Sequence, residues 1–489
     1  MPMNLEEDQD PLLGAAASPR EHPPPRQNGG FCTKLPGVSL FLELHDNFGN
    51  FVYLLASVYI GCKGFIATIV QVGQIPYYKD FLMIPAERYQ SLKTVAGVPW
   101  AMKSMFGALS EAFPILGYHK RYYIIISAGL ALVALFFLGT LPDTTPAGLS
   151  AALFFMTNLF VCFTDLLCEG KYAEKMRENT NTKSGLVSWV WGLTQVGVLA
   201  GSAVAGPISE MGYPRTLFWL CIPAVLQLLP LVFLGWLPEE QLPVGNRGYQ
   251  GDKVKRRPQL FYLGITVACS ALTLAAVGEL CQPVVQFGVS LVVAVVVCFL
   301  GYLWLPPVLA KANLYMFICN AFYLQIDGAT TYFYIAKPEQ YVNSPHFSNV
   351  YYFTYTSLVG AVAGLLGVWL FNTVLSKGNF RTAFWVTTLI QCLSGVFDIV
   401  LVKRWNIALG VPDKLAYMLG DAMIFNVVLM FSYMPAIILT AKACPDQYET
   451  VMYALLAGYQ NLGSTVGSFA GAWLIDISGI NTNPKELPW

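Results

Sequence analysis

Several ionisable side chains lie within strongly apolar stretches of the sequence, where a charge is costly unless it meets a partner or a ligand. They include Lys63, Lys103, Asp165, Glu169 and Asp327, with Asp398 and Asp421. Lys63 lies about 18 Å into its predicted helix at 1.5 Å per residue, so its ammonium cannot easily reach the membrane surface. Residues of this kind bind substrates, carry protons or form ion pairs between helices. They therefore predict a transport pathway or a buried ion-pair network.

Opposite charges and aromatic rings suggest how the roles are divided. We predict that Lys63, Lys103 and Asp327 bind substrate, and that Tyr332 and Tyr334 stack on a planar ring. Lys63 and Asp327 would pair while the site is empty and then hold opposite ends of a substrate. The alternative for these charges is a structural ion pair between helices.

Asp165 and Glu169 are four residues apart and share one face of their predicted helix. Because they lie near its cytosolic end, both a gating salt bridge to a basic loop and substrate contact fit them. A coupling proton would bind one carboxylate, either Asp327 or Asp165.

The elements that must position these residues are apolar helices. Hydrophobic residues make up 55% of the 489 positions and charged residues only 12%, against about 25% charged in soluble domains. A membrane span needs roughly 20 mainly apolar residues. The sequence has thirteen such segments, near 51–72, 94–116, 121–141, 147–169, 184–208, 215–237, 259–279, 284–305, 311–335, 349–375, 382–402, 415–442 and 450–476.

Charge distribution predicts the orientation. Residues 1–50 are polar and Pro-rich, so we predict a cytosolic disordered tail without a signal peptide. With the N-terminus inside, the inner segments carry about twice as many Lys and Arg as the outer ones. The longest inner loop, 238–258, is basic. A formal net charge of zero gives no reason to expect nucleic acid as a partner.

An internal repeat predicts two bundles. Gly107 precedes Arg121 by the same distance as Gly367 precedes Arg381, and Gly197-x-x-x-Gly201 recurs as Gly463-x-x-x-Gly467. Parallel repeats of this kind build major facilitator transporters. We predict a six-helix bundle over 51–237, an inserted helix pair over 259–309 and a second bundle over 310–489. The second bundle is one helix short. Both glycine pairs are expected to be close helix-packing faces.

Enzyme and cofactor motifs are absent from the sequence. It has no His-Glu-x-x-His, no phosphate-binding Gly loop ending in Lys and no Gly-x-Ser-x-Gly. Its cysteines form no metal-ligand pattern. We expect no catalysis, cofactor or metal.

Several motifs resemble those of the folate–biopterin transporter family. Their residues are Pro99-Trp100-x-x-Lys103-x-x-x-Gly107-x-x-Ser110-Glu111, Lys120-Arg121, Asp165-x-x-x-Glu169-Gly170-Lys171-Tyr172, Asp327-Gly328-Ala329 and Phe380-Arg381. The chain has Ser104 where the family commonly has Pro, and Glu111 where it commonly has Asp. Glu111, Arg121 and Arg381 are predicted to join Asp165 and Glu169 in proton coupling or gating.

The resemblance implies proton-linked transport of folates or pterins. We separately expect a location in the plasma membrane, with an endosomal or lysosomal membrane as the alternative. The physical chemistry is compatible, because a lysine suits the carboxylates of folate and a carboxylate suits the donors on a pterin edge. S-adenosylmethionine, whose sulfonium favours acidic and aromatic contacts, is one alternative. Another small solute and a transport-inactive receptor or scaffold are the others.

Overall fold

The computed structural model describes residues 36–178, 183–256, 258–338, 341, 343–370, 380–430 and 449–479. Within these ranges the chain is helical apart from turns and one isolated bridge, Ile115 to Tyr118. The chain divides into two units, Met1–Glu43 and Leu44–Trp489. Residues 1–35 of the predicted tail lie outside the described residues. Pro36–Phe48 forms helix α1 instead of a disordered tail, because Leu40, Leu44 and Phe48 recur every four residues and give one apolar stripe.

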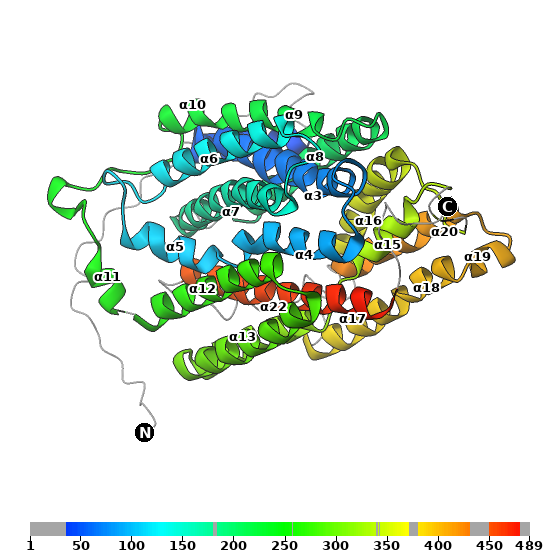
Figure 1. Cartoon of the computed structure of the whole chain (residues 1–489). Coiled ribbons are helices and arrows are strands. Elements are labelled where there is room, and N and C mark those ends of the chain that lie inside the picture. The colour runs from blue at the N-terminus through cyan, green and yellow to red at the C-terminus, as the bar shows by residue number, and fades with distance from the viewer. Residues whose placement is uncertain are drawn as a thin grey trace. The chain divides into compact units, whose positions relative to one another are not determined.

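The first half of the unit Leu44–Trp489 consists of six consecutive helices or groups of short helices that follow predicted segments one to six (Figure 1). They are α2 to η3 (α2 Phe51–Ala56, η2 Ser57–Ile66, α3 Ala67–Pro76, η3 Tyr77–Phe81), α4 to α5 (α4 Ala86–Gly97, η4 Val98–Trp100, α5 Lys103–Ala112), α6 Arg121–Thr140, α7 Ala147–Glu178, α8 Lys183–Glu210, and α9 Thr216–Leu226 with α10 Leu228–Phe233.

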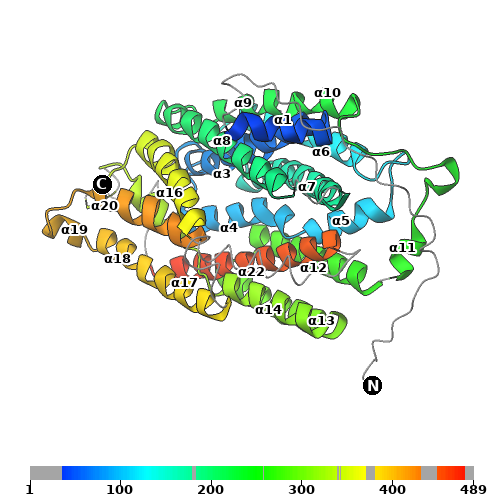
Figure 2. The same cartoon turned by 180° about the vertical axis from the view of Figure 1, so that it is seen from behind.

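The rest of the chain contains the inserted pair and the second half (Figures 1 and 2). A loop with η6 Val244–Asn246 and α11 Gly251–Arg256 leads to the inserted pair, α12 Pro258–Leu280 and α13 Pro283–Trp304. The second half comprises α14 Pro307–Ala321, α15 Asp327–Tyr334, η7 Val350–Tyr355, α16 Thr356–Leu370, α17 Phe380–Ser394, α18 Val396–Val402, α19 Trp405–Ala408, α20 Asp413–Tyr417, η9 Met418–Ile424 and α22 Glu449–Ile477. Eight helices of the described chain are long and apolar enough to cross a membrane. The count of thirteen spans stays a prediction.

The ninth predicted segment, 311–335, is broken in the structure. Helix α14 ends at Ala321 and α15 begins at Asp327, with residues 322–326 in between. The backbone groups freed by the break bond to other helices: Gln325 N–H donates to Gly467 O at 3.3 Å, and Gln90 Nε2 donates to Gln325 O at 3.2 Å. Non-helical backbone at membrane depth is tolerated where protein satisfies it in this way.

The two glycine pairs pack as predicted, each against the first helix of its own half. A Cβ on Gly197 would lie 2.2 Å from Ile60 O, and one on Gly463 would lie 2.4 Å from Phe317 O. In each of these two contacts the helices approach so closely that their backbones meet, which only glycine permits. Because α8 contacts η2 as α22 contacts α14, the repeated sequence signal corresponds to a repeated contact.

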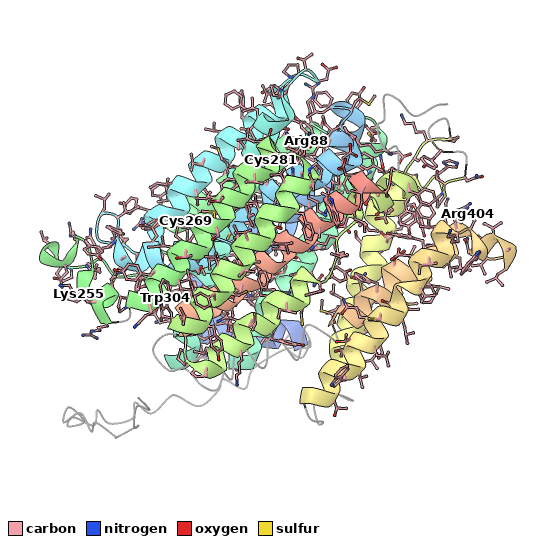
Figure 3. The ribbon with its side chains drawn as sticks, turned by 60° about the horizontal axis from the view of Figure 1, so that its bottom comes forward. Arg88, Lys255, Cys269, Cys281, Trp304 and Arg404 are labelled. Carbon is pink, nitrogen blue, oxygen red and sulfur yellow. The ribbon has the colours of Figure 1, made fainter. Side chains whose placement is uncertain are left out.

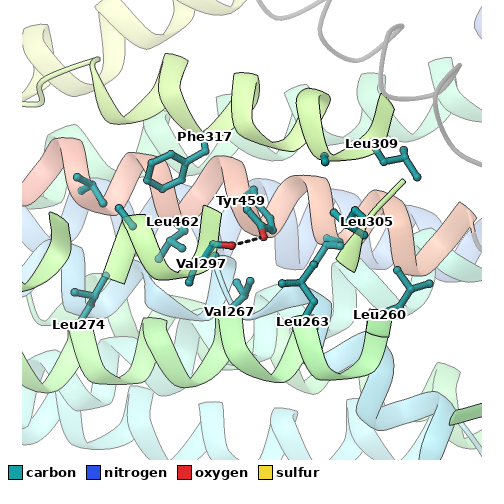
Figure 4. Close-up of a cluster of buried hydrophobic side chains, with 14 of the residues drawn as sticks. Leu260, Leu263, Val267, Leu274, Val297, Leu305, Leu309, Phe317, Tyr459 and Leu462 are labelled. Carbon is teal, nitrogen blue, oxygen red and sulfur yellow. Dashed lines mark hydrogen bonds between the residues drawn. The ribbon is translucent and has the colours of Figure 1, made fainter. Parts of the chain in front are cut away.

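The inserted pair lies over the junction of the two halves. Helix α12 packs on α4 and α5 of the first half, and α13 packs on α22 and α14 of the second. Figures 1 and 2 both show α4 and α5 between α7 and α12. A cluster of buried apolar side chains from α12, α13, α14 and α22 fills the contact (Figure 4). In it, Tyr459 donates its hydroxyl hydrogen to Val297 O at 2.9 Å.

Tyr459→Phe is expected to loosen this contact by losing that buried hydrogen bond, at a cost of about 0.5–1.5 kcal/mol. A thermal unfolding scan in detergent should show a transition lower by a few degrees. Tyr262→Phe on α12 is the matched control, because the Tyr262 side chain is 58% exposed. Equal transitions in both variants would contradict the prediction.

Candidate functional site

Three helices of the first half bring two lysines to one carboxylate. Lys63 Nζ on η2 lies 2.8 Å from Asp165 Oδ1, and Lys103 Nζ on α5 lies 2.7 Å from Asp165 Oδ2. The Asp165 side chain on α7 is only 1% exposed. Each carboxylate oxygen thus accepts a charge-assisted hydrogen bond from a different ammonium, which is the arrangement that makes a buried charge tolerable.

A second carboxylate completes this ion cluster, which we define as Lys63, Lys103, Asp165 and Glu169. Glu169 Oε2 is 3.8 Å from Lys103 Nζ, and the Tyr172 hydroxyl donates to Glu169 Oε1 at 3.5 Å. The Glu169 side chain is 22% exposed. Asp165 and Glu169 do share a helix face, as their spacing predicts, but Glu169 has the longer and weaker contacts.

Aromatic rings surround the two ammonium groups. Lys63 Nζ lies 5.5 Å from the ring centroids of both Tyr59 and Trp191. Lys103 Nζ lies 4.9 Å from the ring of Trp100. These distances suit cation–π attraction. The same rings offer flat apolar surfaces beside a positive charge, which is a suitable environment for a planar, anionic molecule.

The buried hydroxyl of Tyr59 has no hydrogen-bond partner among the residues that the structure describes. Tyr59 lies within electrostatic range of Asp165 and Glu169. Since buried polar groups are nearly always paired, this hydroxyl can accept or donate a hydrogen bond to a bound molecule at the ion cluster.

The predicted pairing of Lys63 with Asp327 is wrong in this structure. Asp327 Oδ2 instead lies 2.8 Å from Lys93 Nζ on α4, and the Asp327 side chain is 53% exposed. The break after α14 explains the difference, because it places Asp327 at the first turn of the separate helix α15. Lys103, which was also predicted to bind substrate, joins the ion cluster.

Asp327 belongs to a set of contacts between the halves that we call the latch. It comprises the Lys93–Asp327 pair, Lys79 Nζ donating to Ile335 O at 2.9 Å, and the Tyr332 hydroxyl donating to Ile84 O at 2.9 Å. The latch joins the end of the first helix and the start of α4 to α15. It therefore closes the two halves against each other at this membrane face.

Both tyrosines predicted to stack on substrate have protein partners. Tyr332 stacks on Tyr89 with centroids 5.7 Å apart and an interplanar angle of 27°. The Tyr334 hydroxyl donates to Asp398 Oδ1 at 3.0 Å. In this conformation the two rings hold helices together.

The remaining predicted gating residues lie at the opposite membrane face. Glu111 Oε1 is 3.9 Å from Lys120 Nζ, and the Arg121 guanidinium donates to Phe233 O at 2.6 Å. Asp165 does not bind this basic loop, because Lys63 and Lys103 occupy both of its oxygens. The side chain of Arg381 lies outside the described residues.

Sequence reasoning missed Glu239, Arg88 and Lys93. Glu239 accepts the backbone N–H groups of residues 119–121 at the start of α6, as an acidic side chain at a helix N-terminus does. Arg88 binds Glu279 Oε1 at 2.8 Å, near the Cys281 turn of the inserted pair (Figure 3). Because the second segment was predicted to begin near residue 94, Arg88 and Lys93 counted as loop residues.

Lys93→Glu and Asp327→Lys are each expected to slow transport, since each places like charges across the latch. The double variant with both Lys93→Glu and Asp327→Lys has opposite charges again and should recover much of the transport rate. The pair is partly exposed, so its coupling is about 0.2–1 kcal/mol. Uptake measured for all four proteins, normalised to the amount in the membrane, gives the coupling directly. A double variant slower than both single ones would exclude this pair from the latch.

Solved transporters share this helix arrangement. A POT family transporter in complex with 5-aminolevulinic acid matches with a TM-score of 0.64 at 14% identity, over 88% of this chain and 91% of that one. The nucleoside transporter NupG matches with a TM-score of 0.54 at 11% identity, over 91% and 93%. Such identities show the fold alone. The chain is an all-helical, multi-pass integral membrane protein with the major facilitator fold, as the internal repeat predicts.

Sequence relatives identify the family. The probable folate-biopterin transporter 6 of Arabidopsis thaliana is 24% identical over 446 residues, covering 90% of this chain and 78% of the relative. The folate-biopterin transporter of Synechocystis sp. is 25% identical over 404 residues, covering 81% and 70%. The model of the BT1 family matches residues 63–487. The chain belongs to the BT1 family, a family of transporters and not of enzymes.

Proposed function

We propose that this protein transports folate- or pterin-type heteroaromatic metabolites across a membrane by alternating access. The names of its relatives support this substrate class. The observation that carries the proposal is the ion cluster, in which two lysines and three aromatic rings meet inside the first half. A substrate that carries a carboxylate on a flat ring system would match both the lysines and the aromatic rings.

Lys63 is the residue that we assign to the substrate carboxylate. Its side chain is 24% exposed, whereas that of Lys103 is 8% exposed, so Lys63 is the more accessible ammonium. Lys103 would hold Asp165 in place and add positive charge, and Trp191 would flank the ring. Substrate contact by Asp327, Tyr332 and Tyr334 stays a prediction, and it requires the latch to open.

Membrane and orientation also belong to the proposal. The bias of Lys and Arg supports a cytosolic N-terminus, which places the latch at the outer face and the Glu111–Lys120 pair at the inner face. We propose the plasma membrane as the location, with endosomal or lysosomal membranes as alternatives. The two-bundle organisation around an inserted pair is supported by the repeated glycine contacts.

One observation favours a second candidate substrate, S-adenosylmethionine. In the second half, Tyr334, Tyr352 and Tyr417 pack together beside Asp398 and Asp421. No Lys or Arg pairs with either aspartate within the part of the chain that the structure describes. Acidic groups among aromatic rings suit a sulfonium cation.

Uptake into proteoliposomes tests the proposal. The purified full-length chain should take up radiolabelled folate or biopterin, and unlabelled compound of the same class should compete. Uptake of S-adenosylmethionine alone would favour the second candidate. Specific uptake of none of the three, by protein that is folded in the liposomes, would point to another solute or to a transport-inactive receptor.

A further inference from the structure

We infer that Glu169 is the group that carries the transported proton, an inference that rests on the proposed function as carrier of a carboxylate-bearing substrate. From the sequence we expected Asp165 or Asp327 to bind the coupling proton, and we placed Glu169 only in the wider set for proton coupling or gating. The contacts of these carboxylates in the structure argue for Glu169 instead.

The first argument is how strongly each carboxylate is held. Both oxygens of Asp165 accept hydrogen bonds from ammonium groups, at 2.8 and 2.7 Å, so a proton there would have to displace one of them. Asp327 binds Lys93 at 2.8 Å in the latch, outside the ion cluster. Glu169 contacts Lys103 only at 3.8 Å and keeps 22% of its side chain exposed. It is the carboxylate of the cluster that a proton can reach at the least cost.

The second argument is charge balance. Two ammonium groups and two carboxylates make the empty ion cluster neutral. When a substrate carboxylate binds Lys63, three carboxylates share two ammonium groups and the cluster carries one excess negative charge. Excess charge in a poorly solvated site is costly. A proton from the bulk that binds a Glu169 oxygen restores neutrality, and it returns to solution when the substrate leaves on the other side.

The surroundings of Glu169 support the same assignment. The charged and titratable groups that act on it are Lys103 from α5, Lys63 from η2, and Asp165 and Tyr172 from α7. Tyr59 of η2 is within electrostatic range of Glu169, and its buried hydroxyl has no hydrogen-bond partner among the described residues. The Tyr172 hydroxyl donates to Glu169 Oε1 at 3.5 Å and can stabilise its ionised form, which makes binding and release of the proton reversible.

Glu169→Gln tests the inference, because Gln keeps the shape of the side chain but cannot titrate. The variant should lose acid stimulation, so that uptake at acidic pH divided by uptake at neutral pH falls to about 1. An imposed proton gradient should no longer drive accumulation. Exchange of labelled for unlabelled substrate should persist. With one negative charge removed, KM for the anion should fall by up to about tenfold.

Glu174→Gln is the matched control. Glu174 lies on the same helix and pairs with Lys171 at 2.8 Å, so this variant also breaks an ion pair of α7. It should keep acid stimulation. Exchange by Glu169→Gln shows that the variant is folded. Accumulation of substrate by Glu169→Gln that is still driven by the proton gradient would overturn the inference.

The same experiments separate this inference from the proposed function. If the wild-type chain transports folate and Glu169→Gln remains acid-stimulated, the proton assignment fails and the function stands. If the wild type instead transports a different anion, and Glu169→Gln loses the coupling, the substrate class fails and the proton assignment stands. An uncoupled wild type, with uptake that does not depend on the proton gradient, overturns the inference as well.

Discussion

Asp165→Asn is expected to reduce strongly the amount of folded protein in the membrane. The amide cannot balance the two ammonium groups that now share Asp165, and Lys103 is nearly buried. Removing one partner of a buried pair costs about 3–5 kcal/mol, which is a large part of the stability of a typical domain. Size-exclusion chromatography in detergent should show a sharply reduced peak of monodisperse protein.

A compensated variant distinguishes folding from transport. Replacing Asp165 by Leu, both lysines by Met and Glu169 by Gln removes every charge of the ion cluster, and apolar replacements of buried ion pairs are often tolerated. This quadruple variant should recover folded protein but not transport. Asp165→Asn at wild-type yield and thermal stability would show that the two lysines do not depend on Asp165.

Lys63→Ala is expected to lower uptake of a carboxylate-bearing substrate strongly while leaving the protein folded. Asp165 keeps its 2.7 Å bond to Lys103 in this variant, so the buried carboxylate is still paired. A hydrogen bond to a charged group contributes about 1.5–3 kcal/mol. We therefore expect uptake at low substrate concentration to fall about 10- to 100-fold.

Uptake of labelled folate, normalised to the amount of protein in the membrane, measures this effect. Lys311→Ala is the control, since Lys311 is an exposed lysine on α14. Lys63→Arg keeps the charge and should retain part of the uptake. Normal uptake by Lys63→Ala would remove Lys63 from the substrate site.

The sequence predicts the helices and their packing glycines well, because both depend on local composition. Apolar segments match helices throughout the described chain, and the Gly197 and Gly463 contacts are as expected. The break after α14 was not predictable in this way. Phe322, Tyr323 and Leu324 continue the apolar run, and the groups that satisfy the break come from α4 and α22.

The ion-pair partners of the charged residues within the helices were harder to predict from the sequence than the positions of those residues. The spacing of Asp165 and Glu169 places them on one helix face, but it does not say which helix that face meets. Lys63 was assigned to Asp327 because the two carry opposite charges within apolar segments. Their partners, Asp165 and Lys93, follow from the rotation and register of neighbouring helices, and one sequence does not contain that information.

The inserted pair also changes how the surrounding lipid meets the two halves. With α12 on α4 and α5, and α13 on α22 and α14, acyl chains on this side touch the pair and not the seam between α4 and α22. In the alternating access that we propose, rocking of the halves would be accommodated by sliding between α12 and α13 or by bending of the turn at Cys281. A bilayer of different thickness is therefore expected to change the rate of rocking while leaving the affinity of the ion cluster for its ligand unchanged.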